Sequence, residues 1–224
     1  MPHPATIRLL ADLSEEQWGL FTRRQAEAAG LAWTTVARLA DSGATERVAQ
    51  GVYRLRGVPA ADHLGLRAAW LQLAPEVPVW ERRGDQGVVS HRSAAAVHHL
   101  GHLPADIHEF TLPARRQTRR VDVRLRRADL SDREWVDLGG LLVATPARIA
   151  ADLLRDREDP EAVAQIVVDA LREGKAHPSA VALAIAPYVT TLGLQAGDGT
   201  AALDRLLQLT RDPRRTYWVA QTAS

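Results

Sequence analysis

Two short segments of helical pattern, separated by a glycine, constrain the fold of this chain more than any other feature. Thr22 stands where a helix would begin, and Gln25 follows at the spacing of a capping box, in which each side chain satisfies a backbone group of the other residue. Gly30 suits the left-handed backbone that ends such a helix. A second helix is predicted from about Thr34, as its N-cap, to Ser42. Two short helices joined by a sharp turn are typical of a helix-turn-helix.

The flanking residues complete this domain. The segment Thr45–Leu55 alternates in character and carries Gln50 and Gly51, which predicts a β-hairpin with its turn at that glycine. Upstream, Pro4–Leu20 has apolar residues near helical spacing, and Ser14 is expected to cap a second short helix within it. A hairpin after a helix-turn-helix makes a winged helix-turn-helix, which we place at residues 1–57.

The surface expected to meet DNA follows from this arrangement. Val36 and Leu39 lie three residues apart and should pack inward, which leaves the other side of the second helix free for the major groove. Hydroxyl and guanidinium groups there can contact bases or phosphates, and the hairpin adds polar side chains for the backbone or the minor groove. The predicted DNA-binding residues are Arg23, Trp33, Thr34, Thr35, Arg38, Arg47, Gln50 and Arg54. The alternative is a three-helix unit used for protein contact.

A second domain is predicted at residues 63–224, after a proline-containing linker at 58–62. A helix is expected at its start. Extended segments then follow at residues 88–89, 107–112, 121–127 and 140–144. Later segments are helical, and the clearest helix begins at Thr145 and Pro146. The fold class is therefore α+β: an N-terminal winged helix-turn-helix, then a mixed domain with a small β-sheet and a helical C-terminal half.

The composition narrows the function classes. The chain has 224 residues and no cysteine, which excludes disulfides, thiolate metal sites and cysteine nucleophiles. It has neither an apolar run long enough for a membrane span nor the pattern of a signal peptide, which favours a cytoplasmic protein without a membrane partner. The formal net charge of +1 does not argue against DNA binding, because a nucleic-acid footprint can be local.

Positive charge is concentrated in residues 113–127, which hold seven arginines and one aspartate. Alternation along the strand predicts that Val121, Val123 and Leu125 face the core while arginines face outward. Residues 113–120 are expected to join the two strands as a hairpin. The predicted basic partner-binding face consists of Arg115, Arg116, Arg119, Arg120, Arg124 and Arg126. The alternative is a solvated edge strand that charge protects from aggregation.

Histidines cluster just before this basic region. His98 and His102 have the four-residue spacing of two metal ligands on one helix face. A third ligand is not evident and Gly101 interrupts the helix, so no metal site is predicted. His91, which directly follows a predicted strand, is expected to fix a turn by hydrogen bonding.

The alternative hypothesis is an enzyme, namely a nuclease. Glu109 and Asp122 fall on neighbouring predicted strands and could hold Mg²⁺. Nucleases of the PD-(D/E)xK kind usually place a lysine close to their acids, whereas the only lysine here is Lys175, on a late helical segment. We therefore predict no catalytic residues, no cofactor and no enzymatic activity.

Several segments resemble one bacterial family. TRRQAEAAG (22–30) and RVAQGVYRL (47–55) resemble the N-terminal domain of AbiEi-type antitoxins. VSHRSAA (89–95), IHEFTLP (107–113) and GLLVATPARIAADLL (140–154) are similar, in order and spacing, to the antitoxin domain of the same family. Together they cover roughly residues 20–185.

This resemblance implies a type IV toxin–antitoxin or abortive-infection context. The winged helix of this chain would then bind double-stranded DNA and repress the operon that encodes it, with inverted repeats as the expected operator. The second domain would oppose a nucleotidyltransferase-type toxin, with or without direct contact. A stand-alone transcriptional regulator without a toxin, and an adaptor that binds only proteins, are the remaining alternatives.

Overall fold

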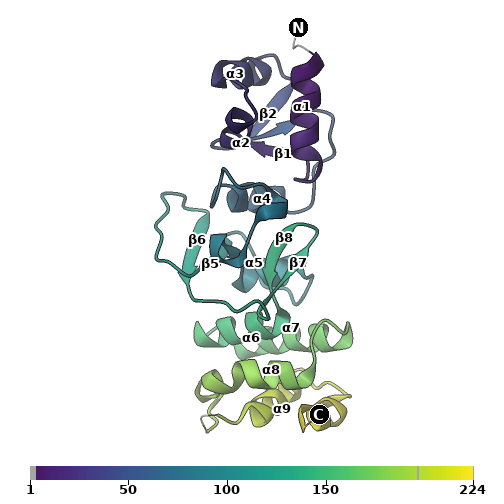
Figure 1. Cartoon of the computed structure of the whole chain (residues 1–224). Coiled ribbons are helices and arrows are strands. Elements are labelled where there is room, and N and C mark those ends of the chain that lie inside the picture. Colours follow the sequence, from purple (N-terminus) through teal and green to yellow (C-terminus); the bar gives the residue numbers. More distant parts are fainter. Residues whose placement is uncertain (1–3, 196, 224) are drawn as a thin grey trace. The chain divides into compact units, whose positions relative to one another are not determined.

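The computed structural model describes residues 4–195 and 197–223, which divide into two compact units. The first unit comprises the chain up to Gly87 together with Asp137–Leu141. The second comprises Val88–Val136 and the chain from Leu142 onward. Figure 1 labels most of the helices and strands and colours the chain by residue number.

The first unit has the element order of a winged helix. Helix α1, strand β1 and helices α2 and α3 are followed by the β2–β3 hairpin, and the strands form an antiparallel sheet in the order β1-β3-β2. The bounds are α1 Pro4–Glu15, β1 Leu20–Thr22, α2 Arg23–Ala28, α3 Trp33–Asp41, β2 Thr45–Ala49, β3 Val52–Leu55 and α4 Leu64–Leu71. The predicted hairpin is confirmed, with its turn at Gln50 and Gly51.

A single apolar cluster holds these elements together. It contains Leu10, Phe21, Ala26, Val36, Leu39, Tyr53 and Leu55. Phe21 and Tyr53 stack with their ring centroids 5.8 Å apart. Burial of such side chains stabilises the fold by roughly 1.5–3 kcal/mol each, so the helices and the hairpin share one core.

Two local predictions are wrong in this region. Ser14 does not cap a second helix: it lies buried within α1, where its Oγ donates to the carbonyl of Ala11 at 3.3 Å. Helix α3 begins at Trp33, and its N-cap is Ala32, two residues before the predicted cap Thr34; the methyl group of Ala32 cannot accept a hydrogen bond. Thr34 is therefore inside the helix and its side chain is exposed.

The first unit continues beyond the predicted linker at 58–62. The ring of Trp70 in α4 lies 6.0 Å from that of Trp18, and its Nε1 donates to the carbonyl of Gly87 at 2.7 Å. Trp18 in turn donates from Nε1 to the carbonyl of Gly139 at 2.8 Å. These contacts explain why residues 63–87 and 137–141 belong with the winged helix rather than with the second unit.

The second unit combines a mixed sheet with packed helices. The sheet has the order β6-β5-β4-β8-β7, and helices α6 to α9 pack on one another. The bounds are β4 Val88–Val89, α5 His91–Val97, β5 His108–Leu112, β6 Val123–Arg127, β7 Trp135–Leu138, β8 Leu141–Ala144, α6 Pro146–Arg155, α7 Pro160–Arg172, α8 Pro178–Ile185, α9 Gly199–Leu209 and α10 Arg215–Ala220. The predicted start of α6 is confirmed, since Thr145 accepts from the backbone of Arg148 and Pro146 follows the cap.

The predicted hairpin between the two basic-region strands is wrong. Strands β5 and β6 pair in parallel, with Phe110 opposite Leu125, and β6 lies at the edge of the sheet. A tight turn cannot join parallel strands, so residues 113–122 must return along the sheet before β6 begins. Val121 lies in this connection, and it is 95% exposed rather than in the core.

Candidate nucleic-acid interface

Helices α2 and α3 meet at a short turn that the local sequence specifies. Thr22 accepts from the backbone N–H of Gln25, and the side chain of Gln25 accepts from the backbone of Thr22, so the predicted capping box is confirmed. Gly30 follows the C-cap of α2 with a φ of 87°, a conformation that glycine adopts without strain. The turn therefore fixes where α3 starts.

The outer face of α3 carries the polar side chains expected there. Val36 and Leu39 are buried, whereas Thr34 and Arg38 are exposed and Thr35 is half-buried. Arg38 lies along the helix: its Nε donates to the carbonyl of Thr34 at 3.4 Å, and its Nη2 to the hydroxyl of Thr35 at 3.3 Å. These are long bonds to neutral groups, and a phosphate oxygen or a guanine edge would replace them with shorter ones.

A pocket brings four of the predicted residues together beside this helix. Its volume is about 450 Å³, and Arg23, Trp33, Arg47 and Gln50 contribute to its lining. The guanidinium of Arg23 lies 4.4 Å from the ring centroid of Trp33, a cation–π arrangement. Arg23 also pairs with Glu27 at 2.7 Å on the protein surface. The start of α2, the start of α3 and the hairpin turn thus line one pocket, with both polar and aromatic side chains.

Arg54 lies differently from the other predicted residues. It projects from β3, forms an ion pair with Glu46 at 2.7 Å, and has a side chain that is 16% exposed. A cross-strand pair of this kind supports the hairpin. Sequence reasoning could not see this pairing, because it depends on the strand register that places Glu46 opposite Arg54.

Sequence reasoning missed Arg24, which also lines the pocket. It forms an ion pair with Glu76 at 3.1 Å, and both side chains are well exposed. Arg24 could have been identified as a candidate from the sequence, because it follows Arg23 in the first turn of α2.

The basic region of the second unit splits into two groups of arginines. In the connection before β6, Arg115, Arg116 and Arg119 are exposed. Arg120 binds Asp122, which holds the pKa of that carboxyl near 2, below its usual range. The structure therefore places the predicted face partly on a surface loop and partly among carboxylates.

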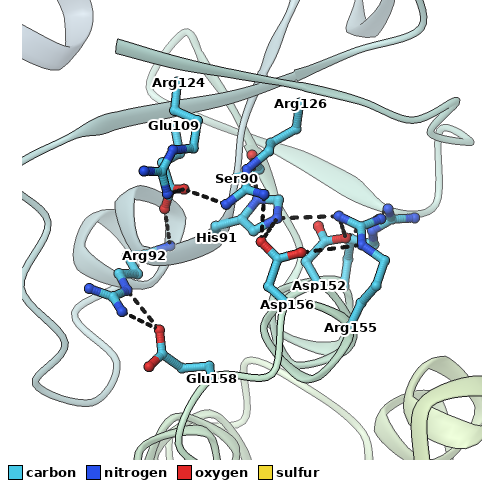
Figure 2. Close-up of polar contacts among 11 residues, drawn as sticks. Ser90, His91, Arg92, Glu109, Arg124, Arg126, Asp152, Arg155, Asp156 and Glu158 are labelled. Atoms are coloured by element: carbon cyan, nitrogen blue, oxygen red, sulfur yellow. Dashed lines mark hydrogen bonds and ion pairs between the residues drawn. The ribbon is translucent and has the colours of Figure 1, made fainter. Parts of the chain in front are cut away.

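Arg124 and Arg126 belong to the second group (Figure 2). Both approach the buried carboxylate of Glu109, Arg126 at 3.2 Å and Arg124 at 3.7 Å. Arg126 also binds Asp156 at 2.6 Å. Figure 2 shows the backbone N–H of Arg92 approaching the same carboxylate, to which it donates at 3.1 Å, while the guanidinium of Arg92 points to Glu158.

His91 sits in the middle of this network. Its Nδ1 is 2.9 Å from Oγ of Ser90, and its Nε2 is 3.6 Å from Asp156. Burial, followed by the nearby charge of Arg126, lowers the pKa of His91 to about 3, while Asp156 opposes this shift. The imidazole is thus neutral near pH 7, and it joins the end of β4 to α6, in keeping with the predicted bonding role.

Serine, histidine and aspartate in a row invite comparison with a hydrolytic triad. Ser90, however, is fully buried and does not line the neighbouring pocket, so a substrate carbonyl cannot reach its hydroxyl. The arrangement connects secondary-structure elements rather than exposing a nucleophile.

The residues considered for a metal are also engaged elsewhere. Nε2 of His98 is 2.9 Å from the carbonyl of Ala144, and burial lowers its pKa. Glu109 and Asp122, the candidate Mg²⁺ ligands, both face arginines. Within residues 4–195 and 197–223, no group of three or more histidine or acidic side chains could hold a metal ion. In the same described ranges, no helix is long and apolar enough to cross a membrane.

Comparison with known families agrees with the geometry of the first unit. Residues 8–56 match the family model described as "Transcriptional regulator, AbiEi antitoxin". A search among curated proteins found no match. The matched residues run from α1 to the end of β3 and include all the predicted DNA-binding residues. The segment that forms the winged helix-turn-helix is therefore similar to the AbiEi antitoxin family of transcriptional regulators.

Proposed function

We propose that this chain is an antitoxin-type regulator that binds double-stranded DNA at its own operator and represses its operon. The observation that carries the proposal is the exposed polar face of α3, with Thr34 and Arg38 beside the pocket formed by α2 and the hairpin turn. The family match to residues 8–56 supports the same role.

In this proposal α3 enters the major groove. Thr34, Thr35 and Arg38 contact base edges or phosphates, since they form the outward face of the helix. Arg23, Arg47 and Gln50 contact the DNA backbone from the adjoining pocket, and Trp33 holds Arg23 in place through its ring. Arg54 reaches DNA only after leaving the carboxylate of Glu46.

Fluorescence anisotropy with labelled DNA from the region upstream of the gene tests this proposal. Arg38→Ala should weaken binding about 5- to 150-fold, the range expected for loss of an arginine–base contact, and Arg47→Ala should reduce the salt dependence of binding. Arg8→Ala is the matched control, because Arg8 is exposed on α1 and does not line the pocket beside α3. If Arg38→Ala and Arg47→Ala bind like the control, the assigned interface is wrong.

For the second unit, we propose opposition to a nucleotidyltransferase-type toxin. The exposed arginines Arg115, Arg116 and Arg119 offer a cationic surface for this partner or for the nucleic acid on which it acts. Co-expression with the toxin gene from the same operon should restore growth, and replacing these three residues with serine should abolish the rescue. A chain that regulates transcription without any effect on growth would instead be a stand-alone regulator.

A further inference from the structure

The second unit contains a pocket that the proposed regulatory function does not use. It has a volume of about 390 Å³ and lies among the start of α5, strands β5 and β6, and the segment that follows α6. Its polar lining includes Arg92, Arg124, Arg126, Glu109, Asp156 and Glu158 (Figure 2). Pockets of this size commonly hold a small molecule.

The charged side chains in this pocket differ in how exposed they are. The side chains of Arg124 and Arg92 are 53% and 40% exposed, whereas those of Glu109 and Glu158 are 5% and 16% exposed. Arg126, at 26%, lies between Glu109 and Asp156 and binds both. Glu109 and Glu158 therefore lie deeper than Arg124 and Arg92, while the exposed Asp106 also stands at the pocket surface.

Arg124 and Arg92 use only some of their N–H groups in the contacts described here. Arg124 approaches Glu109 with one Nη atom at 3.7 Å, a weak contact for a guanidinium that carries five N–H groups. Arg92 binds one carboxylate oxygen of Glu158 with its Nε and Nη2 atoms. An oxyanion with several acceptor oxygens could receive hydrogen bonds from both side chains at once.

The backbone at the pocket is strained. His91 lines the pocket with a φ of 53°, in the left-handed region that non-glycine residues rarely adopt, and its side chain is buried. Such strain persists where the surrounding structure enforces it, and it concentrates at ligand-binding sites. The same left-handed backbone occurs at Trp18, His63, His99, Arg157 and Arg211, so at His91 it accompanies the arrangement of charges and does not by itself mark the pocket.

We propose that this pocket binds a small phosphate-bearing ligand of about nucleotide size, whose phosphate oxygens accept hydrogen bonds from Arg92 and Arg124. Arg126, fixed by Glu109 and Asp156, adds positive charge behind them. The acidic side chain of Asp106, which also lines the pocket and is exposed, opposes the anion. Phosphate is favoured over a carboxylate because its tetrahedral oxygens can accept from guanidinium groups that approach from different directions.

Isothermal titration calorimetry with the full chain tests the proposal. The probes are inorganic pyrophosphate, ATP, adenosine without phosphate, and a short oligonucleotide with a 5′-phosphate. Pyrophosphate and ATP should bind and adenosine should not. If the phosphorylated oligonucleotide binds and the free compounds do not, a nucleic-acid end is the source of the phosphate. Failure of every phosphate compound to bind at millimolar concentration overturns the proposal.

Variants make the test specific to this pocket. The double substitution Arg92→Gln and Arg124→Gln should weaken phosphate binding at least about tenfold, since it removes two charge-assisted contacts. Arg127→Gln is the matched control, because Arg127 is exposed and adjacent strand positions point to opposite faces of β6. Asp106→Asn should tighten binding. Equal binding by the double variant and the control overturns the proposal, while operator binding should be the same in all of these variants.

Discussion

The arginines of the winged helix and those around the sheet of the second unit contact different groups. Arg38 on α3 binds a carbonyl and a hydroxyl, and Arg23 lies over an indole ring with a surface carboxylate beside it. In the second unit, Arg126 and Arg148 bind the buried carboxylates of Glu109 and Asp152 respectively. An arginine such as Arg38 can exchange its contacts for DNA. An arginine such as Arg126 cannot, because its departure would leave a buried carboxylate without a compensating charge.

This difference shows that the number of arginines in a segment does not measure its capacity to bind a partner. Residues 113–127 are the most basic part of the chain, yet Arg120 is held by Asp122 of the same segment and Arg126 by Asp156, which follows α6. The winged helix at residues 1–57 has as many arginines, and it presents Arg38 beside hydroxyl groups and Arg23 beside an aromatic ring. The following predictions test whether the ion pairs of the second unit hold its fold together and whether the arginines of the winged helix can exchange their contacts for DNA.

The largest effect is expected at Asp152, which is 1% exposed. It accepts from Arg148 at 2.8 Å and from Arg155 at 3.1 Å, so Asp152→Ala leaves two partly buried cations without this partner. The substitution should lower the free energy of unfolding by about 3–5 kcal/mol. Urea denaturation followed by tryptophan fluorescence measures the change. A loss below about 1 kcal/mol would mean that this network does not hold the second unit together.

A smaller effect is expected from the titration of His91. Its pKa of about 3 in the folded chain lies below the ordinary value of 6.5, so between these values the unfolded chain binds a proton that the folded chain does not. Stability should therefore fall as the pH falls through this window, by about 2 kcal/mol between pH 7 and pH 5.

The substitution His91→Asn tests this titration, because asparagine does not titrate there and tolerates the left-handed backbone. The variant should lose less stability between pH 7 and pH 5 than the natural chain in matched urea titrations. The lowered pKa of His98 acts in the same direction and should leave a residual dependence. An unchanged pH dependence in the variant would contradict the assignment to His91.

In the winged helix, Thr22→Ala should destabilise the fold by about 1 kcal/mol, since it removes the capping box of α2. The loss of its hydrogen bond to the carbonyl of Pro75 adds to this cost. Thr34→Ala is the control, because Thr34 is exposed inside α3 and caps nothing. Thermal unfolding of both variants should separate them, and equal melting temperatures would show that the cap contributes nothing measurable.

The smallest effect is expected at Glu27. Its pair with Arg23 joins two exposed side chains one helical turn apart, a contact worth about 0.3–0.5 kcal/mol. Glu27→Gln should change stability by no more than this amount, and it should tighten DNA binding because it releases Arg23. Weaker DNA binding would show that Glu27 positions Arg23 rather than competing for it.

Features encoded within a few residues could be predicted from the sequence. The capping box of Thr22 and Gln25, the glycine turn at Gly51 and the helix start at Thr145 all depend on local hydrogen bonds or backbone preferences, and all are present. The same holds for the inward face of α3, which follows from helical spacing. For this reason the fold class and most helices and strands can be predicted from the sequence.

Features that depend on pairing between distant segments could not be predicted. The parallel pairing of β5 and β6 leaves no mark in their alternation, which is the same for either direction. The partners of Arg126 lie in β5 and just after α6, so its role in a buried network required the register of the sheet. The pocket beside it depends on the same register and went unforeseen.

The discontinuity of the first unit has a consequence for its synthesis. The carbonyl of Gly139, which accepts from Trp18, leaves the ribosome long after the winged helix has emerged. Domains tend to fold in the order in which they are made. The nascent winged helix should therefore remain incompletely packed around Trp18 until residues 137–141 arrive. Completion of the regulatory end of the chain is thereby coupled to translation of the first part of the second unit.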